Sequence, residues 1–99
     1  MKRNVVRYKT DPARIEENKR LIEQVFAELN AKSPEGVRYA ALALDDGTFV
    51  HIVETEDGAA TPIPSLDAFR AFQSGIEDRC VEKPVAGAAA IVGNYRMFG

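Results

Sequence analysis

The segment Val37–Glu54, with the sequence VRYAALALDDGTFVHIVE, decides the fold of this chain. Within it, Asp46-Gly47 separates two apolar runs. A type I′ turn needs a positive φ at both of its central residues, and Asp-Gly is one of the few pairs that tolerate this conformation. The segment therefore predicts a central β-hairpin that turns at Asp46-Gly47.

Upstream of the hairpin, the sequence predicts one strand and then one helix. Arg3–Lys9 is short and contains two valines and a tyrosine, which is typical of a strand. Asp11 precedes Pro12, and an acceptor at the N-cap followed by proline predicts a helix that continues to about Ala31. Apolar residues at helical spacing predict its buried side: Ile15, Ile22, Val25 and Leu29. Residues 33–36, Ser-Pro-Glu-Gly, end the pattern before the hairpin.

Downstream of the hairpin, the sequence predicts a loop, a second helix and a last strand. Residues 54–64 are polar and rich in turn formers. Ser65 is a plausible N-cap for a helix that continues to about Arg79, with Leu66, Phe69, Phe72 and Ile76 along its buried side. Pro84 marks the next break, and residues 86–98 are predicted to form the last strand.

The resulting order, β-α-β-β-α-β, predicts an α+β fold of the ferredoxin-like type, with two helices on one face of a four-stranded antiparallel sheet. Both alternating sets of hairpin side chains are apolar, so each face of the sheet needs a cover. The helices cover one face, and we expect a second copy of the chain to cover the other, which gives a homodimer through the sheet face. The sequence leaves open whether Ala41 or Leu42 points away from the helices.

Composition narrows the classes of partner. The 99 residues suit a single domain, 1–99, and a net charge of −2 with interspersed signs offers no basic surface for nucleic acid or an anionic membrane. No apolar run approaches the ~20 residues that span a bilayer. The only cysteine, Cys80, has no intrachain disulfide partner, and residues 1–10 lack the apolar core of a signal peptide. We expect a cytoplasmic protein.

Four segments of the chain resemble the dimeric α+β barrels, and in particular uncharacterised relatives of the antibiotic-biosynthesis monooxygenases. They are residues 36–39 (GVRY), 44–51 (LDDGTFVH), 66–73 (LDAFRAFQ) and 93–95 (GNY). The resemblance spans nearly the whole chain. It implies two subunits whose sheets face each other in a shared barrel, helices on the outside, and a small-molecule pocket in each subunit between helices and sheet.

The same resemblance implies a class of chemistry. Monooxygenases of this family oxidise quinone-like or polyketide aromatics without metal or flavin, and a haem-degrading branch also exists. The haem-degrading branch and several aromatic oxidisers use a tryptophan, whereas this chain has none. In many relatives a histidine lies three residues after the first leucine of the second helix, and here the residue three after Leu66 is Phe69. What the resemblance implies for this chain is the fold and a ligand pocket without a cofactor.

His51, the only histidine, is the candidate catalytic residue because it alone titrates near neutrality without help. A lone histidine on a strand is also often a hydrogen-bonded core or interface residue, and both interpretations stay open. Further residues are candidates for ligand binding, through hydroxyl groups, a fixed cation or aromatic packing: Tyr8, Tyr39, Tyr95, Arg38, Phe69 and Phe72. Simple packing is the alternative role for each tyrosine and the commoner one, and an edge position is the commoner role of Arg7, Arg38 and Arg96 on the predicted strands. Asn4 is a weaker candidate.

Metal binding and nucleophilic catalysis have little support in the sequence. One histidine and one cysteine cannot supply the usual three or four nitrogen and sulfur ligands, so we predict no metal site. The carboxylates of residues 54–57 suit a solvated loop. Cys80 lies beside Arg79 but has no histidine placed as a base, so an inert thiol is expected.

Three functions are compatible with the predicted fold. An RNA-recognition module needs a basic and aromatic third strand, whereas residues 45–52 (DDGTFVHI) are acidic with one aromatic, so this function is excluded. The leading hypothesis is a dimer that binds a small aromatic or quinone-like metabolite, with cofactor-free monooxygenase activity. The alternative is a non-catalytic ligand-binding or accessory module. The sequence does not decide between them.

Overall fold

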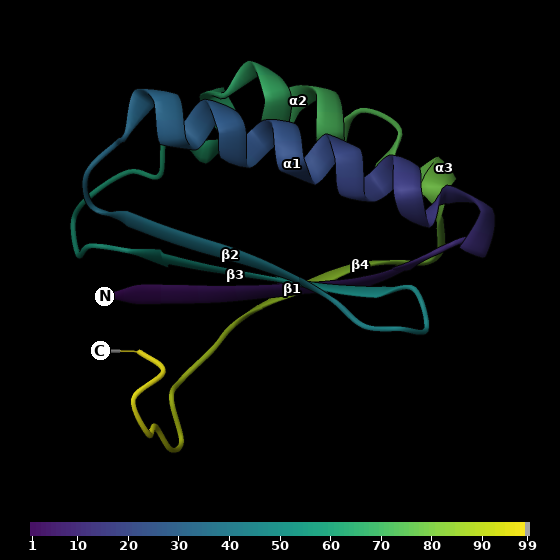
Figure 1. Ribbon diagram of the computed structural model, residues 1–99. Helices are drawn as coiled ribbons and strands as arrows, with labels where there is room; N and C mark the ends of the chain where they lie inside the picture. Colours follow the sequence, from purple (N-terminus) through teal and green to yellow (C-terminus); the bar gives the residue numbers. More distant parts are fainter. Residues whose placement is uncertain (99) are drawn as a thin grey trace.

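A computed structural model of the chain describes residues 1–98 (Figure 1). Four strands form one antiparallel sheet in the order β2-β3-β1-β4: β1 Lys2–Thr10, β2 Val37–Ala43, β3 Thr48–Thr55 and β4 Cys80–Ala88. The helices α1 (Ile15–Lys32), α2 (Asp67–Gln73) and α3 (Ile76–Arg79) lie on one face of the sheet, and two short 3₁₀ turns, η1 (Pro12–Arg14) and η2 (Ile63–Ser65), precede α1 and α2. The predicted ferredoxin-like α+β fold is confirmed.

The start and end of the first helix follow the predicted signals. Asp11 accepts a hydrogen bond from the backbone N–H of Ala13 at 2.9 Å, but the first turn is the 3₁₀ turn η1, and the α-helix itself begins at Ile15. At the other end, Ser33 adopts a left-handed conformation and its N–H donates to the Leu29 carbonyl at 2.7 Å. The helix therefore ends one residue beyond the predicted Ala31.

The central hairpin is confirmed, but the predicted type I′ turn is wrong. Only Gly47 has a positive φ in this turn (89°). The N–H of Gly47 donates to the Leu44 carbonyl at 3.3 Å and that of Leu44 to the Thr48 carbonyl at 2.8 Å, which describes a three-residue loop closed by a glycine bulge. The Asp46 carboxylate accepts from the Thr48 N–H at 2.9 Å, and this local bond favours the longer loop.

The predicted second helix, Ser65–Arg79, is instead two short helices. Gly75, with φ of 86°, separates α2 from α3 because a left-handed residue cannot continue an α-helix. Ser65 does not cap α2, since its hydroxyl donates to the Pro62 carbonyl. The Glu28 carboxylate, on α1, accepts from the N–H groups of Asp67 and Ala68 at 3.4 and 2.8 Å, so a tertiary contact supplies the cap.

The predicted last strand, residues 86–98, is wrong in its extent. Strand β4 is Cys80–Ala88, and the predicted break at Pro84 does not occur. β4 is an edge strand that pairs only with β1, and its register shifts between the pairs Arg7–Val85 and Lys9–Glu82. Proline is tolerated at such an edge irregularity because no ladder hydrogen bond from its nitrogen is needed. Residues 89–98 leave the sheet as an irregular segment on the side opposite the helices (Figure 1).

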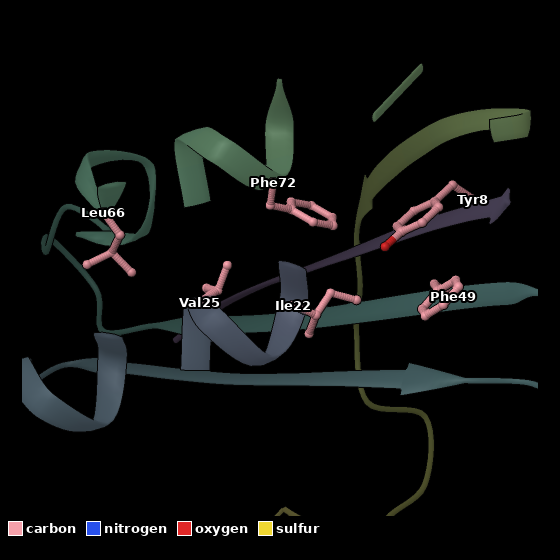
Figure 2. Close-up of a cluster of buried hydrophobic side chains, with 6 residues drawn as sticks. All are labelled: Tyr8, Ile22, Val25, Phe49, Leu66 and Phe72. Atoms are coloured by element: carbon pink, nitrogen blue, oxygen red, sulfur yellow. The ribbon is translucent and has the colours of Figure 1, made fainter. Parts of the chain in front are cut away.

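The core lies between the helices and the covered face of the sheet. Six buried side chains from α1, α2, the residue before α2 and two strands form it (Figure 2): Tyr8, Ile22, Val25, Phe49, Leu66 and Phe72. The rings of Tyr8 and Phe49 stack with their centroids 5.4 Å apart. The predicted apolar stripes of both helices are thus confirmed as the sides that pack on the sheet.

The opposite face of the sheet has no helix over it (Figure 1). The register left open by the sequence is now fixed: Ala41 packs against the core, whereas Leu42 is 53% exposed on the bare face. Among residues 1–98, no helix combines the length and the apolar character that crossing a membrane requires.

Candidate functional site

A pocket of about 220 Å³ lies between the covered face of the sheet and α2, with α3 and the η2 turn at its rim. Most of its wall is apolar or aromatic, from Val6, Val53, Ile63, Phe69, Phe72 and Ile76. The polar side chains that line it are Asn4, Tyr8, Tyr39, His51, Thr61 and Gln73. A mostly apolar cavity with a few polar groups is the usual form of a small-molecule site.

Three neighbouring strands bring the central polar groups together. His51 lies on β3, directly opposite Ala41 of β2 and Val6 of β1. Tyr39 and Tyr8 are two residues away from these partners, on opposite sides, so all three side chains project from the same face of the sheet. This diagonal spacing is within reach of aromatic side chains, and both hydroxyl groups meet the imidazole.

A continuous chain of hydrogen bonds results. The Tyr39 hydroxyl is 2.6 Å from His51 Nδ1, and the Tyr8 hydroxyl is 2.8 Å from His51 Nε2. Asn18 Nδ2, from α1, donates to the Tyr8 hydroxyl at 2.9 Å. Arg79 Nε donates to Asn18 Oδ1 at 3.0 Å. The chain thus connects the pocket to a buried guanidinium group through four hydrogen bonds.

Arg79 is buried, with 2% of its surface exposed, and forms no ion pair with any of residues 1–98. Its remaining nitrogens donate to the carbonyls of Phe72 at 2.6 Å and Ser74 at 3.4 Å. These carbonyls belong to the last turn of α2 and the residue that follows it, where backbone acceptors lack helical partners and a cation is favourable. Arg79 therefore fixes the end of α2 and the orientation of Asn18 together.

Burial sets the protonation states in the pocket. Burial lowers the pKa of His51 from 6.5 to about 4, so the imidazole is neutral at pH 7. Burial also raises the pKa of Tyr39 to about 12, and burial is the largest cause of the raised pKa of Tyr8. Both tyrosines therefore keep their protons at neutral pH. The groups that face the pocket, the two hydroxyls and the imidazole, are therefore neutral when they hydrogen-bond a ligand oxygen.

The structure brings five of the seven predicted site residues to this pocket: His51, Tyr8, Tyr39, Phe69 and Phe72. It does not bring the other two there. Arg38 is exposed on the bare face, and Tyr95 is 79% exposed in the segment after β4. Asn4, the weaker candidate, does line the pocket, and no cluster of three metal-binding side chains occurs within residues 1–98.

Asn18 and Arg79 are functional candidates that the sequence reasoning missed. The sequence could have indicated both residues, because each is a polar residue at helical spacing from the apolar side of its helix. Asn18 lies four residues before Ile22, and Arg79 lies seven residues after Phe72. A polar side chain at such a position is buried with the stripe and needs a polar partner. Which partner it meets depends on how the two helices pack.

Comparison with known proteins identifies the fold. No protein-family model matches the sequence, and no curated protein matches it significantly. Among solved structures, an antibiotic biosynthesis monooxygenase aligns with a TM-score of 0.73 at 16% identity, over 94% of this chain and 100% of that one. A mutant of SnoaB, a cofactor-independent oxygenase from Streptomyces nogalater, aligns with a TM-score of 0.67 at 16% identity, over 96% of each chain.

A third solved structure, Rv0793 from Mycobacterium tuberculosis, aligns with a TM-score of 0.71 at 11% identity, over 94% of this chain and 96% of that one. At these identities the comparison concerns the arrangement of the backbone. The chain has the ferredoxin-like fold of antibiotic biosynthesis monooxygenases.

Proposed function

We propose that this protein binds a small, partly aromatic molecule that carries an oxygen atom, and that it oxidises this molecule with O₂ without a cofactor. The observation that carries the proposal is the pocket between α2 and the sheet. Its aromatic wall, which includes Phe69 and Phe72, suits a flat ring, and its polar corner at Tyr39 and His51 suits one oxygen of that ring.

The oxygenase part of the proposal is supported by the fold shared with SnoaB, which is a cofactor-independent oxygenase. The reaction that we propose for this chain turns the CH₂ group of an anthrone-type substrate into a carbonyl. One atom of O₂ enters the product, and the other leaves as water with the two hydrogens of the CH₂ group. The protein's contribution is to hold the ring and to donate a hydrogen bond to the enolate oxygen that forms when the substrate loses a proton.

One observation favours the alternative, a non-catalytic ligand-binding module. The lowered pKa of His51, about 4, makes the imidazole a weak base at neutral pH. Proton removal from the substrate must then depend on the acidity of the substrate itself. Binding without turnover is the expected behaviour if no such substrate exists.

The test combines ligand binding with oxygen uptake. Wild-type protein is titrated calorimetrically with anthrone-type and hydroquinone compounds, and oxygen consumption is followed electrochemically. We expect uptake above the buffer rate, and a loss of about tenfold or more in Tyr39→Phe. The control is Gln24→Ala, because Gln24 is exposed on α1, away from the pocket and from the bare face of the sheet. Binding without oxygen uptake in wild type would favour the alternative, and absence of binding would contradict both.

We also propose that two copies of the chain pair through the bare face of the sheet. Leu42 and Val85 are 53% and 70% exposed on this side. Ile91, Val92 and Met97, in the segment that leaves the sheet on the same side, are exposed as well. Across the sheet, Val50 and Arg7 lie between Leu42 and Val85, so one cation interrupts this apolar surface. Exposed apolar side chains that gather on one side of a chain favour an interaction site there.

A further inference from the structure

In the hydrogen-bond chain behind the pocket, each group donates to the next one in a fixed order, which we call the direction of the chain. Arg79, at the buried end, determines this order. Arginine can only donate hydrogen bonds. The atom of Asn18 that faces Arg79 Nε at 3.0 Å must therefore be its carbonyl oxygen. The amide NH₂ of Asn18 then faces Tyr8, and the Tyr8 hydroxyl oxygen accepts from it at 2.9 Å.

The next bond follows from the burial of Tyr8. Its hydroxyl has one hydrogen to donate, and the side chain is only 2% exposed. Within residues 1–98 its other hydrogen-bond partner is His51 Nε2 at 2.8 Å. A buried donor without an acceptor is costly, so the Tyr8 O–H donates to Nε2.

The imidazole of His51 then continues the same order of donors and acceptors toward the pocket. A neutral imidazole that accepts at Nε2 carries its proton on Nδ1. His51 is neutral, because burial lowers its pKa to about 4. Nδ1–H therefore donates to the Tyr39 hydroxyl oxygen at 2.6 Å, and the Tyr39 hydrogen has no other partner among the described residues. Tyr39 lines the pocket, where a ligand can accept this hydrogen.

We propose that Arg79 and Asn18 fix the direction of this chain so that Tyr39 presents a free O–H donor to the pocket. The pocket accordingly selects a ligand oxygen that accepts a hydrogen bond, which is a ketone or quinone carbonyl or an oxyanion. The ligand part of this inference rests on the proposed function of the pocket. Asn18 and Arg79 are positioning residues, since they act on the ligand only through Tyr8, His51 and Tyr39.

The substitution Asn18→Asp reverses the chain without changing the shape of the side chain. A carboxylate accepts from Arg79 with one oxygen and from the Tyr8 O–H with the other. The Tyr8 oxygen then accepts from His51 Nε2–H, and His51 Nδ1 accepts from the Tyr39 O–H. Tyr39 is left with an oxygen lone pair toward the pocket in place of a hydrogen.

The first measurement needs no ligand. Because His51 is the only histidine, nitrogen-15 NMR of labelled protein at pH 7 reports its tautomer without ambiguity. We expect a protonated Nδ1 in wild type and a protonated Nε2 in Asn18→Asp. The matched control, Asn30→Asp, makes the same change on the exposed side of α1 and should keep the wild-type tautomer. A protonated Nε2 in wild type, or a folded Asn18→Asp protein without the reversed tautomer, would overturn the inference. The wild-type spectrum decides the direction even if Asn18→Asp does not fold.

The second measurement tests the ligand class with α-tetralone, which only accepts, and α-tetralol, which has the same rings but also donates. We expect Asn18→Asp to weaken α-tetralone binding about fivefold relative to α-tetralol, which is the effect of one lost hydrogen bond. Tyr39→Phe should weaken α-tetralone binding to a similar extent. An unchanged preference with a reversed tautomer would overturn the ligand class. Absence of binding of either compound to wild type, with the expected tautomers, would contradict the proposed function and leave the direction of the chain supported.

Discussion

The two faces of the sheet differ in burial, although both faces of the β2–β3 hairpin are apolar. On β1 the bare face carries Arg3, Arg7 and Lys9. On the covered face, Phe49 and Tyr8 are 1% and 2% exposed, and even His51 is only 4% exposed. On the bare face, Leu42 and Val85 are 53% and 70% exposed. Alternation along the strands therefore tells which residues share a face. The attachment of the helices decides which of the two faces becomes the core.

The polar side chains on the two faces also differ in how they are paired. On the covered face, Tyr39, His51, Tyr8, Asn18 and Arg79 form one connected chain whose members depend on each other. The bare face carries separate ion pairs: Arg7–Glu82, at 4.0 Å, has both side chains more than half exposed, whereas Arg3–Glu54 is largely buried beside Phe98. Exposed pairs of this kind add little to stability, whereas a buried network fixes orientation. The pocket lies where the network ends.

The largest expected effect comes from Phe49→Ala, which breaks the core of the covered face. Phe49 stacks on Tyr8, and truncating a buried phenylalanine removes about 3–5 kcal/mol from the free energy of unfolding. Urea unfolding followed by circular dichroism measures the loss. Gln24→Ala, on the exposed side of α1, should stay within about 0.5 kcal/mol of wild type. Equal losses in the two variants would mean that this face is not the core.

A smaller effect is expected from pH, because His51 is neutral in the folded protein and protonates readily when unfolded. Its pKa is lowered by burial from 6.5 to about 4, so below pH 6.5 the unfolded chain binds the extra proton first. The contribution of His51 to the free energy of unfolding is complete above pH 6.5. It falls as the pH drops toward 4, by roughly 3 kcal/mol in total. Unfolding curves between pH 7 and pH 4 should show this slope in wild type and a flatter one in His51→Gln. Parallel slopes would contradict a neutral, buried imidazole.

The smallest expected effect on intrinsic stability comes from Leu42→Asp, although its effect on assembly is large. Leu42 is half exposed in the isolated chain, so the aspartate should cost the monomer less than about 1 kcal/mol. In the proposed dimer the same carboxylate is buried without a partner and blocks association. Light scattering at micromolar concentration should give a dimeric mass for wild type and for Gln24→Glu, an exposed change on α1, and a monomeric mass for Leu42→Asp. A monomeric wild type would end the dimer proposal.

Much of the architecture could be predicted because it depends on local patterns. Spacing and turn formers predicted the Val37–Glu54 hairpin, the Asp11 cap of the η1 turn that leads into α1, and the strand at residues 3–9. The fold class followed from the order of these elements. Errors occurred where a distant contact replaced a local signal: Glu28 caps α2 in place of Ser65, and pairing with β1 carries β4 through Pro84.

The sequence by itself determined which residue types the site would contain. The single histidine and the tyrosines on the predicted strands pointed to His51, Tyr8 and Tyr39, since few other side chains could serve a ligand oxygen. Only the tertiary structure decided that these three groups touch, that Tyr95 and Arg38 do not join them, and that Asn18 and Arg79 complete the chain. The physical reason is that a hydrogen bond between residues as far apart as 18 and 79 depends on the register of the strands and the packing of α1 against α3, which no local spacing in the sequence encodes.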